Sequence, residues 1–220
     1  PLHSSAASDV YKRQKYDGVF GIWYGKGPGV DRAGDALKHV NLAGSSKFGG
    51  VIALMGDDHI CESSTTSHQS EFAMIDAMIP FFNPSGVQEI LDYGIIGIEL
   101  SRKSGCWVGI KCVHDNVSSG ATVDLDENRL KIVDISNENY PSEGLNIRLK
   151  DTAQEKEYRL HHHKIKYVKE FCKKNNLNKI IFDSENPKVG IISTGKSFLD
   201  TKLGLELSLI HISEPTRPLR

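Results

Sequence analysis

The residues with the most varied chemistry lie in one polar stretch, which runs from Asp57 to Gln69. It follows an apolar run, Val51–Met55, of the kind that forms a buried parallel strand, and it precedes a helix pattern that begins near Phe72. Its candidate site residues are Asp57, Asp58, His59, Ser63, Ser64 and Gln69. Because ligands of open α/β sheets bind beyond the carboxyl ends of the strands, we expect a site in this loop.

Two kinds of chemistry are open to this stretch. Asp57, Asp58, His59 and His68 offer oxygen and nitrogen ligands for a divalent metal, but their spacing matches no strong metal motif. Asp57 could instead accept hydrogen bonds from the backbone that follows it, as acids at strand ends commonly do. Both interpretations stay open, and we assign no metal to the loop.

Strand and helix patterns alternate around this loop. Strands are expected at 16–24, 50–55, 79–82 and 107–113, and helices at about 31–43, from Phe72 onward and at 85–103, where Ser85 is the expected cap and Gly105 the expected end. The order βαβαβαβ predicts a parallel sheet with flanking helices.

A glycine-rich segment, Gly25–Gly29, follows the first strand pattern. Its sequence, GKGPG, matches neither GxxxxGK[ST] nor GxGxxG, the two phosphate-binding motifs. We therefore interpret it as a connecting loop, with Asp31 as the cap of the next helix.

The second half of the chain is more polar. We expect residues 121–186 to form a connector that contains a basic helix, EYRLHHHKIKYVKEFCKKNN, at 157–176. Its three consecutive histidines, 161–163, cannot all bind one ion, since neighbouring helical residues point about 100° apart. Two more apolar runs follow at 180–183 and 189–193, and the second is predicted as the first strand of a new α/β domain.

Composition excludes several classes of protein. The chain has 220 residues, of which 39% are hydrophobic and 25% charged, as in ordinary globular domains. Its net charge of -1 argues against a nucleic-acid partner held by bulk electrostatics. No apolar run approaches the roughly 18 residues of a membrane span, and the first residues lack the pattern of a signal peptide. The four cysteines form no CxxC pair, so we expect reduced thiols in a cytoplasmic protein.

The two ends read differently from the middle. SSAASDVYKRQ, from Ser4, and LSLIHISEPTR, from Leu207, match translations of the two adapters used in transposase-based DNA library preparation, whose DNA shares an inverted repeat. We therefore interpret residues 1–14 and 207–220 as adapter-derived tails. On this interpretation the biological sequence is Lys15 to Glu206, an internal fragment of a longer protein.

Three segments together resemble a known family. YDGVFGIWYGKGPGVDRAGDALKHVNLAG, then GGVIALMGDDH with SSTTSHQSE, then PKVGIISTGKSFLD are similar, in order and spacing, to the long fused-chain form of the indolepyruvate ferredoxin oxidoreductase family. The resemblance covers essentially the whole of residues 15–206. Members of this family are thiamine-diphosphate-dependent 2-oxoacid:ferredoxin oxidoreductases.

The resemblance implies a domain order. Residues 15–120 would be an incomplete pyrimidine-type thiamine-diphosphate-binding domain, and residues 187–206 the start of a transketolase-C-like domain. The parent enzyme would oxidatively decarboxylate an aryl-2-oxoacid of the indolepyruvate type to an acyl-CoA, with ferredoxin as electron acceptor. It would use thiamine diphosphate with Mg²⁺ and iron–sulfur clusters. The alternative is a non-catalytic α/β interaction module of a multidomain assembly.

The resemblance also places residues near the cofactor or substrate. Lys38, His39 and Asn41 match a Lys-His-…-Asn pattern of the family's pyrimidine domain. The glutamate that activates the cofactor would precede Lys15, and the GDG…N motif that binds the diphosphate and Mg²⁺ belongs to another domain. GDD at 56–58 departs from GDG. We therefore expect no catalytic residue, metal or bound cofactor in this fragment alone, and the remaining domains of the parent chain as its partners.

Overall fold

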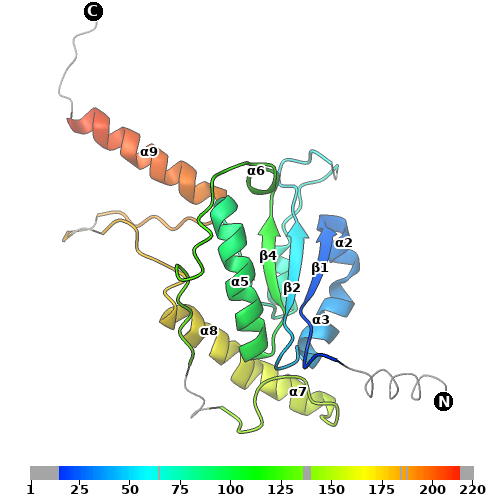
Figure 1. Cartoon of the computed structure of the whole chain (residues 1–220). Coiled ribbons are helices and arrows are strands. Elements are labelled where there is room, and N and C mark those ends of the chain that lie inside the picture. Colours follow the sequence, from blue (N-terminus) through cyan, green and yellow to red (C-terminus); the bar gives the residue numbers. More distant parts are fainter. Residues whose placement is uncertain (1–14, 64, 136–139, 184, 187, 214–220) are drawn as a thin grey trace, which may run out of the picture.

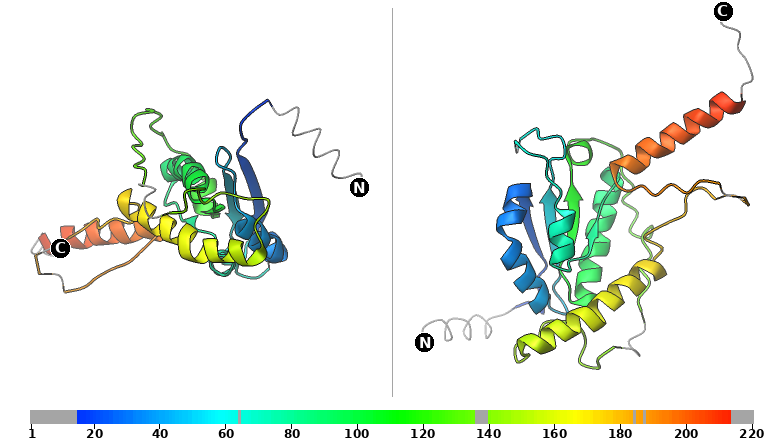
Figure 2. Two further views of the ribbon diagram at one scale, coloured as in Figure 1. Left: turned by 90° about the horizontal axis from the view of Figure 1, so that it is seen from below. Right: turned by 180° about the vertical axis from the view of Figure 1, so that it is seen from behind.

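The computed structural model describes residues 15–213, except for residues 64, 136–139, 184 and 187. A parallel sheet lies between two layers of helices (Figures 1 and 2). Its strands are β1 (Gly21–Lys26), β2 (Val51–Gly56), β3 (Phe81–Phe82) and β4 (Val108–Cys112), in the spatial order β1-β2-β4-β3. The predicted α/β class, with a parallel sheet and flanking helices, is confirmed.

Alternation along the strands divides the apolar side chains between the two faces of the sheet. Ile22 lies opposite Ile52 in the register, and Leu54 lies opposite Ile110, so these four residues share one face. Met55 lies on the other face, in a separate buried cluster. Each face therefore needs its own layer of helices, as parallel sheets do.

The face of Met55 is covered by α2 (Gly27–Arg32), α3 (Gly34–Ala43) and α4 (Glu71–Asp76). The apolar residues of these helices and of the strands that they cover form one core, made of Val30, Leu37, Met55, Met74, Ala77 and Ile79. These helices occur in the connections after β1 and β2, whose right-handed crossovers bring them to the same side.

The glycine-rich segment was predicted as a loop, and that prediction was wrong. Gly25 and Lys26 end β1, and Gly27 begins α2 directly, so no loop separates strand from helix. Pro28 suits the first turn of a helix because its missing N–H would have no partner there. Asp31, the expected cap, lies inside α2, and α3 follows Ala33 without a side-chain cap.

The other face is covered by α5 (Val87–Ser104), which packs against β2 and β4. Gly105 ends this helix in the left-handed conformation, with φ of 70°, as predicted. Ser85 does not cap the start. Gly86 occupies the cap position, while the N–H and hydroxyl of Ser85 donate to Glu89 at 2.7 and 2.8 Å.

The basic helix packs outside α5. It is continuous through α7 (Ala153–Arg159), a π-helical turn η2 (Leu160–Lys164) and α8 (Ile165–Lys174). Thr152 and Glu155 form a capping box at its start, four residues or so before the predicted beginning. His161 and His162 are exposed, which agrees with a solvated helix face.

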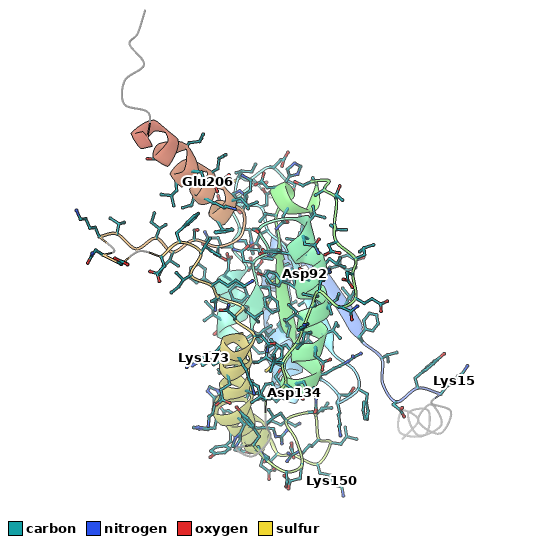
Figure 3. All side chains as sticks on the ribbon, turned by 60° about the vertical axis from the view of Figure 1, so that its left-hand side comes forward. Lys15, Asp92, Asp134, Lys150, Lys173 and Glu206 are labelled. Atoms are coloured by element: carbon teal, nitrogen blue, oxygen red, sulfur yellow. The ribbon has the colours of Figure 1, made fainter. Side chains whose placement is uncertain are left out.

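The rest of the second half has little regular structure. The described residues between 118 and 152 form no helix or strand, as expected of a connector. The predicted strand at 189–193 is wrong, because these residues form no strand and Val189 is exposed. The apolar run at 180–183 forms no strand in its described residues either, and Ile180 is exposed. An apolar run forms a strand only when neighbours bury it, and here none do. A final helix, α9 (Lys196–Ser213), projects from the sheet domain (Figures 1 and 3). Its last residues, 207–213, belong to one of the two predicted tails. The other predicted tail, 1–14, lies outside the described residues, and so do residues 214–220.

Within the described residues, no helix has the length and apolar character that crossing a membrane requires.

Candidate functional site at the carboxyl ends of β2 and β4

The polar stretch lies where two connections leave the sheet toward opposite faces. After β2, the loop 57–70 leads to α4 on one face. After β4, the short helix α6 (His114–Val117) leads to the connector, which packs on the α5 face through Leu130. Such a switch point at the carboxyl edge is where open α/β sheets bind ligands. The loop therefore lies where such sheets bind ligands, and its role as a site stays a prediction.

Asp57 is the most buried acid of this edge. Its carboxylate oxygens accept hydrogen bonds from the N–H of Ser70 at 3.1 and 3.0 Å, and one also accepts from the Ser70 hydroxyl at 2.5 Å. The ammonium of Lys111, on β4, lies 3.6 Å away. Asp57 thus satisfies the backbone that follows it, which is the second of the two interpretations open from sequence.

His68 joins this acid to α2. Its Nε2 lies 3.0 Å from Asp31 and its Nδ1 lies 3.4 Å from Asp57. The ring lies directly against Gly27, where a Cβ would stand 2.1 Å from it, so this close approach requires glycine. Burial opposes the charged ring, yet hydrogen bonds to Asp31 and Asp57, and their charges, raise the pKa of His68 above 6.5.

Asp58 organises the exposed part of the loop. Its carboxylate accepts hydrogen bonds from the N–H groups of Glu62 and Ser63 at 2.8 and 2.7 Å. Ser63 and Gln69 are exposed. Ser64, another candidate, lies outside the described residues.

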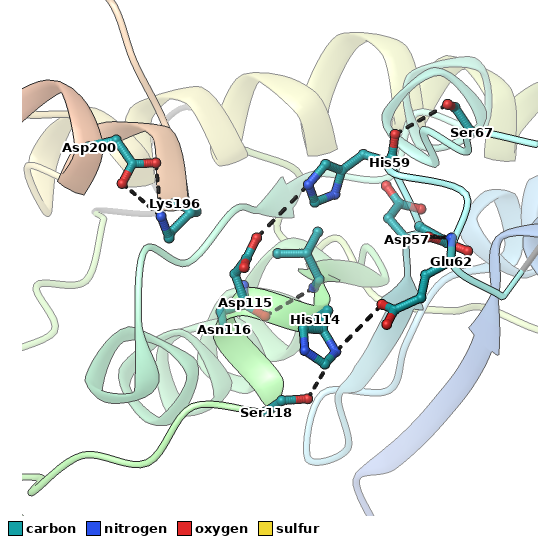
Figure 4. A network of polar contacts seen from close by, with 12 residues as sticks. Asp57, His59, Glu62, Ser67, His114, Asp115, Asn116, Ser118, Lys196 and Asp200 are labelled. Atoms are coloured by element: carbon teal, nitrogen blue, oxygen red, sulfur yellow. Dashed lines mark hydrogen bonds and ion pairs between the residues drawn. The ribbon is translucent and has the colours of Figure 1, made fainter.

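Two imidazole–carboxylate contacts connect this loop to α6 (Figure 4). The Nε2 of His59 lies 3.9 Å from Asp115, and the Nδ1 of His114 lies 3.9 Å from Glu62. The loop thus contributes one imidazole and one carboxylate, and so does α6, so the two contacts join the segments that follow β2 and β4. Among the residues that the structure describes, no three His, Cys, Asp or Glu side chains are arranged to hold a metal ion.

Sequence reasoning missed the residues that β4 and α6 contribute. Lys111 contacts Glu71 of α4 and approaches Asp57, while its side chain is only 12% exposed. His114 and Asp115 follow directly after the strand. A lysine within the otherwise apolar run WVGIKCV is the signal that could have pointed to this edge, since an isolated charge in a buried strand needs a partner.

The other three candidates, Lys38, His39 and Asn41, lie at the amino ends of the strands, away from the strand-end loop. The amide nitrogen of Asn41 donates to the carbonyls of Ala77 and Met78, before β3, and its oxygen accepts from the N–H of Trp107, before β4. All three partners mark the amino ends of strands. Lys38 pairs with Asp76 at 2.5 Å, and exposed His39 approaches Asp35 at 3.6 Å. The structure therefore does not bring this group together with the strand-end loop.

A larger groove lies away from both groups. It has a volume of about 660 Å³ and runs along α5, beside β1 and the connector. Its walls are mostly apolar, with Ile22, Leu54, Ile95 and Ile98 among them. Its charged lining residues are Glu99, Arg102, Lys103 and Asp134, and they pair with one another. The groove is therefore better suited to another apolar surface than to catalysis.

No protein-family model, curated protein or solved structure matches this chain. Its function therefore has to be inferred from its own residues and geometry.

Proposed function

We propose that this chain is part of a thiamine-diphosphate-dependent 2-oxoacid:ferredoxin oxidoreductase, of which it forms the later portion of the pyrimidine-type domain. One observation carries the proposal. The residues of the motif GDDH…SSTTSHQSE that the structure describes form one hydrogen-bonded loop at the switch point of a parallel sheet, where α/β proteins bind ligands. The reaction of the parent would be oxidative decarboxylation of an aryl-2-oxoacid, of the indolepyruvate type, to an acyl-CoA.

The residues at this edge do not fit a complete site for thiamine diphosphate and Mg²⁺. Both carboxylate oxygens of Asp57 accept hydrogen bonds from Ser70, and the Oε1 of Glu71 pairs with Lys111. Only the Oε2 of Glu71 is left without a hydrogen-bond partner in this pair of acids. The described residues hold no metal-binding group. We therefore derive no catalytic step from this chain. Its proposed part is to supply a polar wall, through His59, His114 and the loop that Asp58 holds, against a cofactor bound by another domain.

The parental gene tests this proposal. A GDG…N motif downstream of the codons for residues 15–206 would support the enzyme, since that motif binds the diphosphate and Mg²⁺ in the family that the chain resembles. Calorimetry of the chain itself provides a second test. We expect no binding of thiamine diphosphate with Mg²⁺, and tight Mg²⁺-dependent binding would contradict the incomplete site.

The alternative is a non-catalytic interaction module, and the apolar groove along α5 favours it. An uncovered apolar groove on a parallel sheet, beside the exposed Ile22 and Tyr24, is typical of a surface that another protein segment covers. A parental gene that lacks the GDG…N motif but encodes further folded domains would favour this module over the enzyme.

A further inference from the structure

The outer edge of β1 is open. In the part of the chain that the structure describes, β1 pairs only with β2, which leaves its other edge without a ladder. Figure 2 shows β1 at the margin of the sheet. Tyr24 and Ile22 are 80% and 58% exposed. The open edge of a strand presents unpaired N–H and C=O groups, which can pair with a strand of another molecule.

The direction of each backbone group follows from one hydrogen bond. The N–H of Gly21 donates to the carbonyl of Gly50 at 2.9 Å, so Gly21 points toward β2. In a parallel strand the N–H and C=O of one residue point to the same side, and successive residues alternate. Trp23 and Gly25 therefore also point toward β2, while Ile22, Tyr24 and Lys26 point outward.

The two edges of the sheet differ in their protection. β3, at the far edge, has only two residues, and Pro80 and Pro84 flank it closely. Short edge strands and prolines prevent pairing with other molecules. β1 has six residues with no proline among them, and its single charged side chain is Lys26 at the end. One edge is thus blocked and the other is available.

We propose that the outer edge of β1 pairs with β1 of a second copy of this chain, antiparallel, about a two-fold axis at Trp23. In this register the outward-pointing residues meet one another, because Ile22 of each copy lies opposite Tyr24 of the other. The two residues exchange both main-chain hydrogen bonds. Their side chains form an aromatic and β-branched pair, which is among the favourable cross-strand pairs. Lys26 of each copy meets Phe20 of the other, where a cation and an aromatic ring attract.

The same geometry limits the assembly to two chains. A two-fold axis uses the same edge on both copies, so the interface is closed. The outer edges of the resulting eight-stranded sheet are both β3, which is short and flanked by proline. The dimer therefore does not continue into a fibre. This proposal does not rest on the proposed enzymatic function, because it is argued only from the backbone and side chains at the outer edge of β1.

Two measurements on the whole chain test the dimer: sedimentation reports its mass, and amide hydrogen exchange reports which backbone N–H groups are protected. We expect the mass to rise from one chain to two with increasing concentration. The amides of Ile22 and Tyr24 should become protected in step with the mass, whereas those of Trp23 and Gly25 should be protected in both states. A monomer at all concentrations, or a dimer in which the Ile22 and Tyr24 amides still exchange freely, would overturn the proposal.

A proline substitution tests the edge directly. Tyr24→Pro removes an outward N–H and the aromatic ring, but it leaves the ladder to β2, since Trp23 and Gly25 supply those donors. Each dimer contains the substitution twice, so we expect the dissociation constant to rise about tenfold or more. Tyr24→Phe is the matched control, because it keeps the ring and the N–H, and its dissociation constant should stay near that of the original chain. If Tyr24→Pro folds normally by circular dichroism and dimerises as before, the proposal is wrong.

Discussion

Asp57 and Ser70 tie the end of β2 to the start of α4. Both carboxylate oxygens of Asp57 accept from the N–H of Ser70, at 3.1 and 3.0 Å, and the Ser70 hydroxyl donates to the same group. The ammonium of Lys111 supplies a positive charge at 3.6 Å. The carboxylate is fully buried, so its hydrogen bonds and this charge must offset the cost of removing it from water.

Replacing this acid should cost much stability. Asp57→Ala leaves the Ser70 N–H without its acceptor and Lys111 without one of its two acids, and we expect the free energy of unfolding to fall by about 3 kcal/mol. Urea denaturation measures this loss. Asp58→Ala is the matched control, since the loop groups that donate to this side chain are exposed, and it should cost less than about 1 kcal/mol. Equal losses from the two substitutions would contradict the anchoring role of Asp57.

His68 should make stability depend on pH. Burial opposes its charge, but hydrogen bonds to Asp31 and Asp57 raise its pKa above 6.5 in the folded chain. The folded state therefore binds this proton more tightly than the unfolded chain does. The resulting stability is fully present below pH 6.5 and is lost as the pH rises through the raised pKa. We expect His68→Gln to remove this part of the pH dependence, measured as urea midpoints in a series of buffers across that range. The exposed His161→Gln should leave it intact, and an unchanged pH dependence in His68→Gln would refute the role of the two acids.

Substitution of Asn41 tests whether its role is structural or a contact with the cofactor. Its buried amide joins α3 to the residues before β3 and β4 through three hydrogen bonds. Asn41→Ala leaves the N–H of Trp107 and two carbonyls unpaired, so we expect a loss of about 2–4 kcal/mol in the free energy of unfolding. His39→Ala, on the exposed side of the same helix, should stay within about 0.5 kcal/mol. A small effect of Asn41→Ala on urea denaturation would mean that its main role is not structural.

Lys164 should produce the opposite pH dependence at alkaline pH. It lies in the π-helical turn, and its ammonium donates to the carbonyl of Gly105 at 3.1 Å. Burial lowers its pKa from 10.5 to about 8. Between these two values the unfolded chain binds more protons than the folded chain, so stability rises with pH.

Lys164→Met should abolish this rise. Burial raises the pKa of the neighbouring Cys106 thiol to about 11, and that group acts in the opposite direction. The comparison is therefore cleanest in a Cys106→Ala background, where the opposing titration is absent. Urea denaturation above pH 8 measures it, and a stability that stays flat with Lys164 present would show that the ammonium is not desolvated.

The sheet was predictable because its strands are short apolar runs with helix patterns between them. The strand predictions at Val51–Met55 and 107–113 needed no tertiary information. The prediction that Gly105 ends α5 was also correct. The α2 helix was missed because GKGPG has the composition of a turn, and only packing of Val30 and contact between Gly27 and His68 favour a helix there.

The site was predictable in part. The position of the loop followed from the strand before it, since the carboxyl edge is fixed by chain direction. The contributions of Lys111, His114 and Asp115 depend on which strands are neighbours, and β4 lies beside β2 only because the chain returns from β3 to the middle of the sheet. This strand order leaves no local signal in the sequence. The placement of Asn41 at the amino ends of the strands and of Asp57 at a carboxyl end leaves none either.

The most direct test of the proposed function is the oxidation of indolepyruvate by the full-length parent protein. The protein would be purified without oxygen and supplied with thiamine diphosphate, Mg²⁺, CoA and ferredoxin. We predict that ferredoxin is reduced only when both indolepyruvate and CoA are present, and that omission of thiamine diphosphate abolishes the reaction. A folded parent that holds its iron–sulfur clusters and thiamine diphosphate, yet reduces no ferredoxin with any aryl-2-oxoacid, would contradict the proposal.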